Sequence, residues 1–361
     1  MSATPLTALF FEPERLSALV EDLGGRPFHA KILREQVLGA GVLDYDGMTS
    51  LPARLRADLA ASHPILSASE LGRTRSRDNT TKLLLGFPRR RANEGGPGEV
   101  TETEGHDAVE TVHIPSHKGN KGATLCVSTQ VGCPVACPFC ASGRAGLVRN
   151  LEAYEILEQY LAGRALGPVA RSVVMGIGEP LLNFKATSAA LRIVHDELGL
   201  GQRKITVSTV GFPDRLRAAA DESPPFQLAI SLHTPFDEER DVLVPAMKGT
   251  PIEDVLEAGD YWFNTTGREI TYEYVLLGGE NDTPDHAEAL ADRLAGRRCM
   301  VNLIPFNPVD ESGYARPTTE AVEGFRDDLE HAGIVATVRW SRGMESDAAC
   351  GQLRLQSGAG V

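Results

Sequence analysis

The chain has 361 residues, of which 42% are hydrophobic and 24% charged, and its formal net charge is −13. These values predict a globular protein of one large domain or two, and the acidic balance argues against bulk affinity for nucleic acid without excluding a local basic face. The sequence shows no run of about 20 apolar residues and no basic segment before its first short apolar stretch, so we expect neither a membrane span nor a signal peptide. We therefore expect a cytoplasmic protein, which we take to be a monomer, whose six cysteines serve metal binding or catalysis rather than disulfide scaffolding.

The first part of the chain, residues 1–85, is predicted to form a small helical domain. Pro27 stands where a helix would begin, and apolar residues follow it at helical spacing. Residues 86–121 are predicted to be a linker. Its glycine-rich and charged insert at 88–107 has no periodicity and is expected to be a loop, and a strand that carries Glu110 follows it.

The core of the protein is predicted to occupy residues 122–361, where strand-like and helical patterns alternate. Repeated strand–helix units imply a parallel sheet. About six units are too few for a closed barrel of eight strands, so the expected fold is α/β, a partial (β/α)6 TIM-like barrel with its site at the carboxyl ends of the strands. The candidate strands are 124–128, 172–175, 204–208, 227–231, 269–276 and 300–304, with 335–340 as a possible seventh.

A cysteine-rich loop follows the first of these strands and reads CVSTQVGCPVACPFC. Cys133, Cys137 and Cys140 form a C-x3-C-x2-C pattern, and Cys126 lies seven residues upstream. Closely spaced thiolates suit zinc or an iron–sulfur cluster. Structural zinc requires four ligands, usually in paired knuckles, whereas three cysteines without a fourth in register favour a cube-type cluster with one open iron. The alternative is a structural zinc loop in which Cys126 is the fourth ligand.

Polar residues at the ends of the later strands are candidates for ligand binding. Glu179 follows the second strand in a Gly-Ile-Gly-Glu turn, where glycines can let the backbone approach a ligand, and it is a candidate acceptor for a ligand ammonium group. Ser208, Ser231 and Asn307 lie at the ends of other strands and could hydrogen-bond a nucleoside or an amino acid, although each is also a common turn residue. His233 is equally consistent with a structural histidine at a strand end.

Two further groups are candidates for covalent and acid–base chemistry. Cys350 lies in the segment DAACGQL, whose small residues predict an accessible loop. Cys350 and Cys126 are therefore candidates for two thiols that converge on one site and act covalently or pair transiently. Glu110 is a candidate general base.

The sequence blocks together resemble the RlmN/Cfr family of radical S-adenosylmethionine (SAM) enzymes, which methylate an adenosine of 23S ribosomal RNA. The resemblance covers nearly the whole chain and includes ETVHIP, TLCVSTQVGC, CPFCASGRAG, VVMGIGEPLLN, AISLHTPFDEERD, VNLIPFNP and AACGQL. It implies that the cysteine triplet ligates a [4Fe-4S] cluster whose open iron binds the amino and carboxylate groups of SAM. The residues that it assigns to SAM binding are Gly178, Glu179, Ser208, Ser231, Leu232, His233 and Asn307.

The resemblance also implies a mechanism with two molecules of SAM per turnover. One SAM methylates Cys350 at sulfur, and the second is cleaved to a 5′-deoxyadenosyl radical that takes a hydrogen from that methyl group. The resulting carbon radical adds to the adenine ring. Glu110 then removes the ring proton, and Cys126 forms a disulfide with Cys350 that releases the methylated base.

We therefore expect methylation at C2 of an adenosine in 23S rRNA, with transfer RNA as a further candidate substrate and an electron donor such as flavodoxin as a partner. Two alternatives stay open: methylation at C8 of the same adenosine, and a non-catalytic RNA-binding protein with a structural zinc loop. The segment DNTTK at 78–82 departs from the D-G-T-K pattern of many family members, which weakens any claim about the RNA target.

Overall fold

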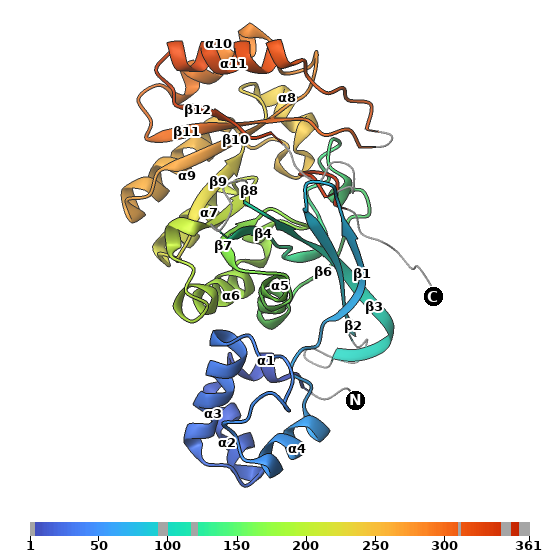
Figure 1. Cartoon of the computed structure of the whole chain (residues 1–361). Coiled ribbons are helices and arrows are strands. Elements are labelled where there is room, and N and C mark those ends of the chain that lie inside the picture. The colour runs from blue at the N-terminus through green and yellow to red at the C-terminus, as the bar shows by residue number, and fades with distance from the viewer. Residues whose placement is uncertain (1–3, 93–99, 117–121, 310–311, 341–347, 354–361) are drawn as a thin grey trace.

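The computed structural model describes residues 4–92, 100–116, 122–309, 312–340 and 348–353, with the side chains of 90–104 left undescribed. A helical unit forms one end of the molecule, and one of its helices begins at Pro27 as predicted (Figure 1). Its buried leucines, among them Leu33, Leu55 and Leu59, give the unit its own apolar interior. The unit consists of α1 (Leu6–Leu9), α2 (Pro13–Asp22), α3 (Pro27–Arg34), the π-helix η1 (Glu35–Gly39) and α4 (Ala53–Ser62).

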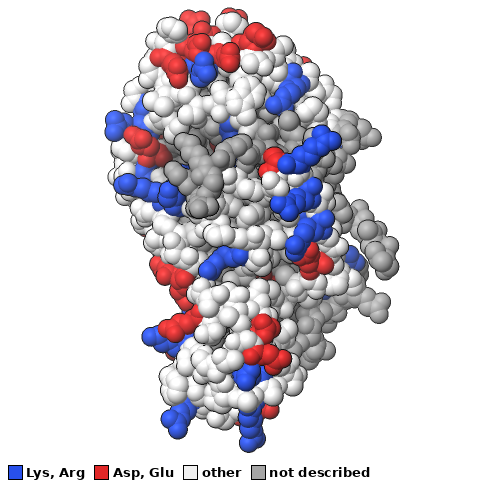
Figure 2. All heavy atoms as spheres, in the orientation of Figure 1, with Lys and Arg blue, Asp and Glu red and all other residues white. Residues whose placement is uncertain are grey.

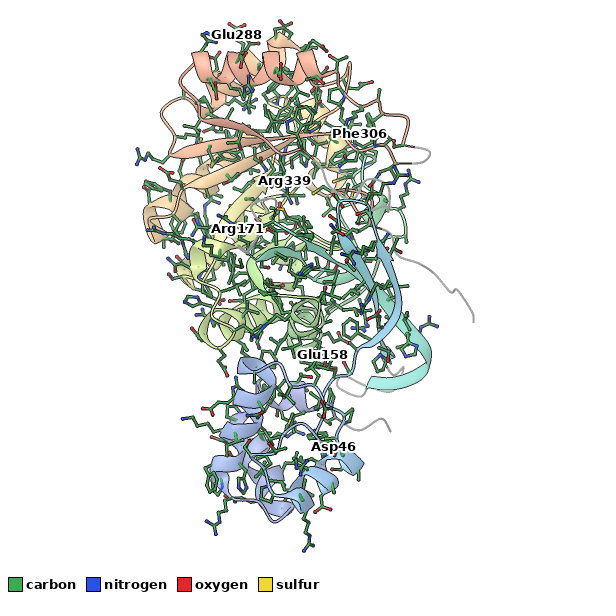
Figure 3. All side chains as sticks on the ribbon, viewed as in Figure 1. Asp46, Glu158, Arg171, Glu288, Phe306 and Arg339 are labelled. Atoms are coloured by element: carbon green, nitrogen blue, oxygen red, sulfur yellow. The ribbon has the colours of Figure 1, made fainter. Side chains whose placement is uncertain are left out.

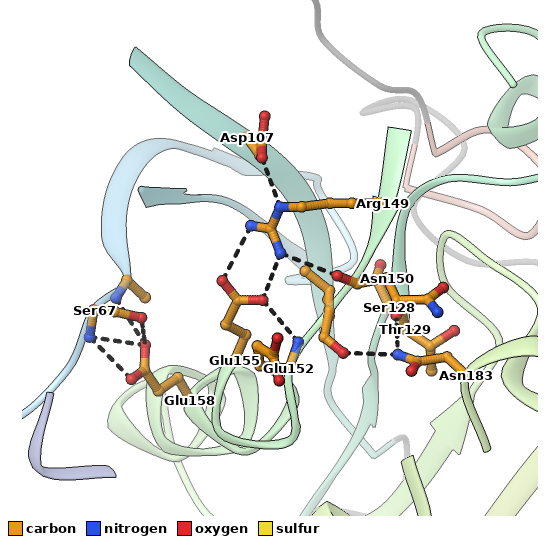
Figure 4. Close-up of polar contacts among 12 residues, drawn as sticks. Ser67, Asp107, Ser128, Thr129, Arg149, Asn150, Glu152, Glu155, Glu158 and Asn183 are labelled. Atoms are coloured by element: carbon orange, nitrogen blue, oxygen red, sulfur yellow. Dashed lines mark hydrogen bonds and ion pairs between the residues drawn. The ribbon is translucent and has the colours of Figure 1, made fainter. Parts of the chain in front are cut away.

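A buried carboxyl group joins the helical unit to the rest of the molecule. Glu158, on α5 (Ala153–Ala165), accepts hydrogen bonds from the backbone N–H groups of Ser67 and Ala68 and from the hydroxyl of Thr7. Figure 4 shows Glu158 facing Ser67. Burial raises the pKa of Glu158 to about 7, although these donors oppose the rise. The helical unit is thus fixed to the barrel at the point where its chain leaves for the sheet.

The remaining chain forms a sheet of ten strands in the order β1-β2-β3-β4-β7-β8-β9-β10-β11-β12. From β4 to β12, each strand in this order is parallel to the next. The predicted partial barrel and its six strand–helix units are confirmed, and the possible seventh strand is β12. These strands are β4 (Ala123–Cys126), β7 (Val169–Val174), β8 (Ile205–Thr209), β9 (Gln227–Ser231), β10 (Ile270–Leu276), β11 (Cys299–Pro305) and β12 (Ala336–Val338).

Helices between consecutive parallel strands cover the sheet. α5 follows β4, and the later helices lie along the outer side of the sheet in Figure 1. None of the helices in the described part of the chain is long and apolar enough to cross a membrane. The helices after α5 are α6 (Phe184–Asp196), α7 (Pro213–Asp221), α8 (Asp237–Leu243), α9 (Ile252–Thr266), α10 (Pro284–Leu294) and α11 (Thr319–His331).

Three antiparallel strands extend the barrel sheet where we expected a helix, a loop and, around Glu110, a strand. These strands are β1 (Ser69–Arg75), β2 (Thr81–Ala92) and β3 (Val100–Ile114). The helical prediction for residues 1–85 is therefore wrong beyond α4, and the loop prediction for 88–107 is wrong on both sides of 93–99, which lie outside the described residues. The physical reason is tertiary: β2 pairs with β3, and β3 pairs with β4, so the sheet satisfies backbone groups whose local composition shows no strand pattern.

Candidate active site

The cysteine-rich loop leaves the carboxyl end of β4 and returns through a short hairpin. β5 (Gln130–Gly132) directly precedes the cysteine triplet. β6 (Leu147–Asn150) follows the triplet and pairs with β5. The thiols of Cys133, Cys137 and Cys140 line one cavity of about 160 Å³ at the carboxyl ends of the parallel strands. Burial raises the pKa of Cys137 well above its ordinary value, and the neighbouring Cys140 and Cys133 raise it further. The three thiols therefore lie close enough to influence one another.

An ion-pair network holds the return strand of this loop in place, as Figure 4 shows. Arg149 on β6 contacts Asp107 on β3 through Nε at 2.6 Å and Glu155 on α5 through Nη1 at 2.7 Å. Burial alone would lower the pKa of Arg149, but the hydrogen bonds and charges of Glu155 and Asp107 raise it above its ordinary value. Both carboxylates are almost completely buried. Asp107 also pairs with Arg89 at 3.4 Å, whereas the ion pair of Glu155 within the described residues is with Arg149 alone.

Replacing Arg149 with methionine should lower the free energy of unfolding by about 3–5 kcal/mol, because it leaves the buried Glu155 carboxylate without its cation and Asp107 with only the longer contact to Arg89. Urea unfolding followed by circular dichroism would measure the change. Arg203→Met is the matched control, since Arg203 is exposed and should change stability by less than about 0.5 kcal/mol. A loss below about 1 kcal/mol for the Arg149 variant would show that the network does not support the loop.

The glycine-rich turn after β7 packs against the backbone that follows β4. A Cβ atom on Gly176 would lie 2.5 Å from the Ser128 hydroxyl oxygen, and one on Gly178 would lie 2.7 Å from the Cβ of Gln130. Gly178 also has a φ of +113°, which side chains rarely tolerate. We expected these glycines to admit a ligand. Both glycines line the cavity, and the structure adds a second reason for them: they let the turn pack closely against residues 128–130.

Glu179 lies at the wall of the same cavity and is 2% exposed. Its carboxylate accepts hydrogen bonds from the N–H of Leu181 at 2.9 Å, the hydroxyl of Thr209 at 2.6 Å and the N–H of Val210 at 2.9 Å. Burial raises the pKa of Glu179, and these three donors oppose the rise. A carboxylate offers about four acceptor positions, so one position remains for a ligand ammonium group.

Two serines at the carboxyl ends of β8 and β9 meet a carboxylate that sequence analysis missed. Ser208 donates to Glu273 at 2.8 Å, and the hydroxyl oxygens of Ser208 and Ser231 lie 3.3 Å apart. Glu273 comes from β10, is 5% exposed and lines the cavity. Its signal in the sequence is a single acid within the apolar strand ITYEYVL. The three groups together offer acceptors for ligand hydroxyl groups.

His233 follows β9 in a left-handed conformation with a φ of +68°. Its Nδ1 accepts a hydrogen bond from the N–H of Val275 at 3.1 Å, and the ring of Phe139 contacts it edge-on at 5.0 Å between centroids. Burial lowers the pKa of His233 to about 3, and the charge of Arg240 lowers it further. The histidine is therefore neutral, and we assign its proton to Nε2 from the hydrogen bond at Nδ1. It lines the cavity as a structural residue that can also donate to a ligand.

Asn307 and Leu232 differ in what they present to the cavity. Asn307 lines it and donates from Nδ2 to the carbonyl of Cys350 at 3.1 Å, so it ties the cavity to the Cys350 loop. Leu232 is fully buried outside the cavity lining and donates its backbone N–H to the carbonyl of Glu273. The structure thus gathers the predicted cofactor residues around one cavity with Leu232 as the exception.

The two thiols predicted for covalent chemistry meet at a second cavity of about 170 Å³. Cys350 lines both cavities, whereas Cys126 lines only the second. Burial raises the pKa of Cys126 to about 12, and the charge of Cys350 adds to the rise while Arg339 opposes it. Both cysteines are free thiols in the structure, so the disulfide between them stays a prediction. The backbone bond from Ala141 N–H to the Gly351 carbonyl at 2.8 Å holds the Cys350 loop against the cysteine-rich loop.

The predicted general base lies apart from both cavity linings. Glu110 on β3 is 1% exposed and forms a 2.8 Å ion pair with the ammonium group of Lys82 on β2. Glu110 lines neither cavity. However, Val112, two residues further along β3, pairs with Cys126 across the sheet. Sequence analysis missed Lys82 as a partner, because only the pairing of β2 with β3 brings the two side chains together.

Comparison with known proteins identifies the family of this arrangement. Residues 127–294 match the model of the radical SAM superfamily. A probable dual-specificity RNA methyltransferase RlmN of Synechococcus sp. (strain CC9311) is 44% identical over 340 residues, which cover 91% of this chain and 93% of the relative. The chain belongs to the RlmN family of radical SAM RNA methyltransferases.

Other members of the RlmN family and a solved structure agree with this assignment. A probable dual-specificity RNA methyltransferase RlmN of Rhodopirellula baltica is 40% identical over 351 residues, covering 96% of this chain and 90% of the relative. The crystal structure of a radical SAM methyltransferase from Sphaerobacter thermophilus superimposes with a TM-score of 0.85 at 38% identity and covers 98% of both chains.

The radical SAM superfamily implies a [4Fe-4S] cluster and SAM, and the residues around the first cavity fit both. Soft thiolates are the ligands of iron–sulfur clusters. Burial raises the pKa of Cys133 and Cys137, so each would be a neutral thiol without metal, and a bound metal would deprotonate it. Within the described ranges, no three His, Cys, Asp or Glu side chains are grouped to hold a single metal ion. Three thiols around a cavity suit a multi-atom cluster better than one zinc ion, which needs four ligands converging on one point.

Proposed function

We propose that this chain methylates a ring carbon of adenine, C2 of an adenosine in 23S rRNA, through an S-methylated Cys350. The observation that carries the proposal is the place of Cys350 on the wall shared by the two cavities. On one side lie the cysteine triplet and the predicted SAM residues, and on the other side lies the second thiol, Cys126. A group that passes from SAM to RNA through Cys350 would need access from both sides.

The proposed ligands of the cluster are Cys133, Cys137 and Cys140, and SAM would occupy the rest of the first cavity. When bound, the cluster and SAM supply the electron, the methyl group and the hydrogen-abstracting radical. Glu179 offers its one remaining acceptor position to the SAM ammonium group. The proposed SAM site is completed by Gly178, Ser208, Ser231, Leu232, His233 and Asn307. Leu232 lies outside the cavity lining and would support the site through its backbone hydrogen bond to Glu273.

The chain's own residues would carry the remaining steps, with two molecules of SAM consumed per turnover. Cys350 accepts the methyl group at sulfur. Glu110, paired with Lys82, is the proposed acceptor of the proton that leaves the adenine ring. The thiol of Cys126 then gives up its proton and bonds to the sulfur of Cys350, and the bond between that sulfur and the new carbon breaks. The carbon keeps the bonding electrons and takes up a proton, so it becomes the methyl group. The methylated base leaves, and a disulfide remains on the enzyme.

The distribution of charge supports an RNA partner on one side of the molecule. Figure 2 shows Asp and Glu gathered over the end where α10 and α11 lie, whereas Lys and Arg form a column on the side of β1 to β3. Arg73 on β1 contributes to this basic side, and its side chain is 51% exposed although it pairs with Glu70. Such a local face can attract phosphates despite the acidic net charge.

The proposed partners and setting follow from the substrate. The relatives are named dual-specificity RNA methyltransferases, and we include transfer RNA as a second substrate of this chain. A small electron-transfer protein such as flavodoxin would supply electrons. Since ribosomal RNA is the substrate, the enzyme would act in the cytoplasm.

Mass spectrometry of adenosines from RNA of cells with and without the protein would test the function. We expect 2-methyladenosine in 23S rRNA only when the protein is present, and its loss when the cell carries Cys137→Ala instead. Appearance of 8-methyladenosine would move the chemistry to C8. Anaerobic reconstitution should give about four irons and four sulfides per chain; stoichiometric zinc without sulfide, together with no methylated adenosine, would overturn the proposal.

A further inference from the structure

The second cavity has a composition that its two thiols do not explain. Its volume of about 170 Å³ far exceeds the roughly 30 Å³ that one water molecule occupies. Besides Cys126 and Cys350, its wall includes Arg339 and Trp340, which follow β12, and Met175, which follows β7. Arg339 and Trp340 add a cation and an aromatic ring to this wall, and such groups can recognise an unstacked nucleobase.

The walls of the two cavities decide from which side a base could approach. Met175 and Cys350 line both cavities, so they form the partition between them. Cys126 lines only the second cavity. If the proposed function holds, Cys126 must attack the sulfur of Cys350 while the base is still attached to it. The base must therefore lie on the side where both sulfurs are accessible. That side is the second cavity.

Arg339 is held at this partition with most of its donors uncommitted. Its backbone N–H donates to the carbonyl of Leu303 at 2.8 Å, which fixes the residue at the end of β12. Its guanidinium donates from Nη1 to the sulfur of Met175 at 3.1 Å, and a thioether is a weak acceptor. Among the described residues, the guanidinium has no other hydrogen bond. Figure 3 shows Arg339 in the middle of the barrel, away from the outer helices.

Trp340 gives the cavity an aromatic surface that is open to solvent. Trp340 is 49% exposed, whereas Trp262, the other tryptophan of the chain, is completely buried in the core. Folding therefore leaves about half of Trp340 open to solvent, although burying the ring would be favourable. A planar ligand that stacks on it would supply that cover.

We propose that the second cavity is the binding site of the substrate adenine, with Trp340 stacking on the ring and Arg339 donating to its acceptor nitrogens. The inference rests on the proposed function, since it takes Cys350 and Cys126 as the two sulfurs that the base must reach. An adenine can enter only when it leaves its stack in the RNA, so the site selects unpaired or flipped-out adenosines. Arg339 and Trp340 are then specificity residues on the RNA side of the partition.

The two tryptophans make a direct binding experiment available. The probe is a short RNA hairpin with one unpaired adenosine in its loop, compared with hairpins that carry uridine or an abasic site at that position. The cluster-containing protein is mixed with each hairpin without SAM, and quenching of tryptophan fluorescence by acrylamide is recorded. We expect the adenosine hairpin to protect Trp340 and the abasic hairpin to protect it much less. Equal protection by both would show contact with the RNA backbone alone and would overturn the base site, as would no protection.

Substitutions separate stacking from folding. Trp340→Ala should weaken binding of the adenosine hairpin by roughly ten-fold or more, while Trp340→Phe, which keeps an aromatic ring, should restore most of the affinity. Arg339→Gln should reduce the preference for adenosine over uridine. Val335→Ala, at the other end of β12 and 61% exposed, is the control and should bind as the parent protein does. Iron content and the thermal unfolding midpoint show whether each variant is folded; a folded Trp340→Ala protein with unchanged affinity would refute the assignment.

The proposed function and the base site fail in different ways. Mass spectrometry of the parent protein after incubation with SAM, without RNA, reports whether Cys350 carries a methyl group. If Cys350 is methylated and the hairpins do not distinguish adenosine, the base site is wrong and the proposed function stands. If Cys350 is never methylated under reducing conditions, the proposed function itself is wrong.

Discussion

Replacing Cys350 with alanine is expected to abolish methyl transfer to RNA while the protein still binds its cluster. Cys350 is not one of the three thiols of the cysteine-rich loop, so the proposed ligand set of the cluster is complete without it. The variant lacks the sulfur that accepts the methyl group, and direct polar transfer from SAM to a weakly nucleophilic ring carbon is a poor route. Transfer of radiolabelled methyl from SAM to RNA should fall to background, and iron content should equal that of the parent protein.

Cys299→Ala is the matched control for this prediction. Cys299 begins β11, lines neither cavity and is a free thiol like Cys350. Burial raises its pKa to about 11, which is consistent with an unreactive structural thiol. Its variant should transfer methyl groups at a rate within a few-fold of the parent. Residual methyl transfer by the Cys350 variant at a comparable rate would exclude a covalent intermediate at that residue.

Replacing Cys126 with alanine is expected to trap the RNA on the enzyme. Cys350 keeps its place on the partition, so the methyl group can still be loaded and joined to the base, but the thiol that would release the base is absent. Cys126 lines the second cavity beside Cys350 and lies outside the first, so its loss should spare SAM binding. The product is a covalent protein–RNA species, and free methylated RNA should fall by orders of magnitude.

Denaturing gel electrophoresis of labelled RNA would detect this species, and its mass would locate the link at Cys350. The double variant with Cys126→Ala and Cys350→Ala is the control and should form no adduct. Clean multiple turnover by the Cys126 variant would contradict the assignment of Cys126 as the resolving thiol. An adduct that dithiothreitol releases would identify a disulfide rather than the expected carbon–sulfur bond.

The strands of the barrel could be predicted from the sequence because each buried strand is a short apolar run bounded by turn residues. β9 occupies Gln227–Ser231, the predicted range. β10 differs from its predicted range by one residue at one end, and β11 by one residue at each end. Of the hairpin of β2 and β3, the strand around Glu110 was predicted, but the stretch from 88 to 107 was not. The glycines and clustered charges of that stretch indicate a loop locally, and only strand pairing makes its described residues part of the sheet.

The same division applies to the candidate site. The cysteine triplet and the polar residues at strand ends were identified from spacing, because parallel strands bring their carboxyl ends to one rim. Glu273, Lys82 and Arg339 were missed. The first two are charged residues within ordinary strands, the third directly follows a strand, and the partner of each comes from another element. The close contact of Gly176 with the backbone after β4 was also missed, because no local pattern reports it.

The sequence by itself therefore determined the barrel, the cluster-type cysteine spacing and the family, because these depend on local periodicity and on short motifs whose residues act together. Only the tertiary structure decided how the two free thiols are arranged. It places Cys350 on the partition between two cavities and Cys126 on one side of it, with Arg339 and Trp340 beside them. The physical reason is that a partition is made by packing segments far apart in the chain, and no spacing along the sequence encodes which side of it a sulfur faces.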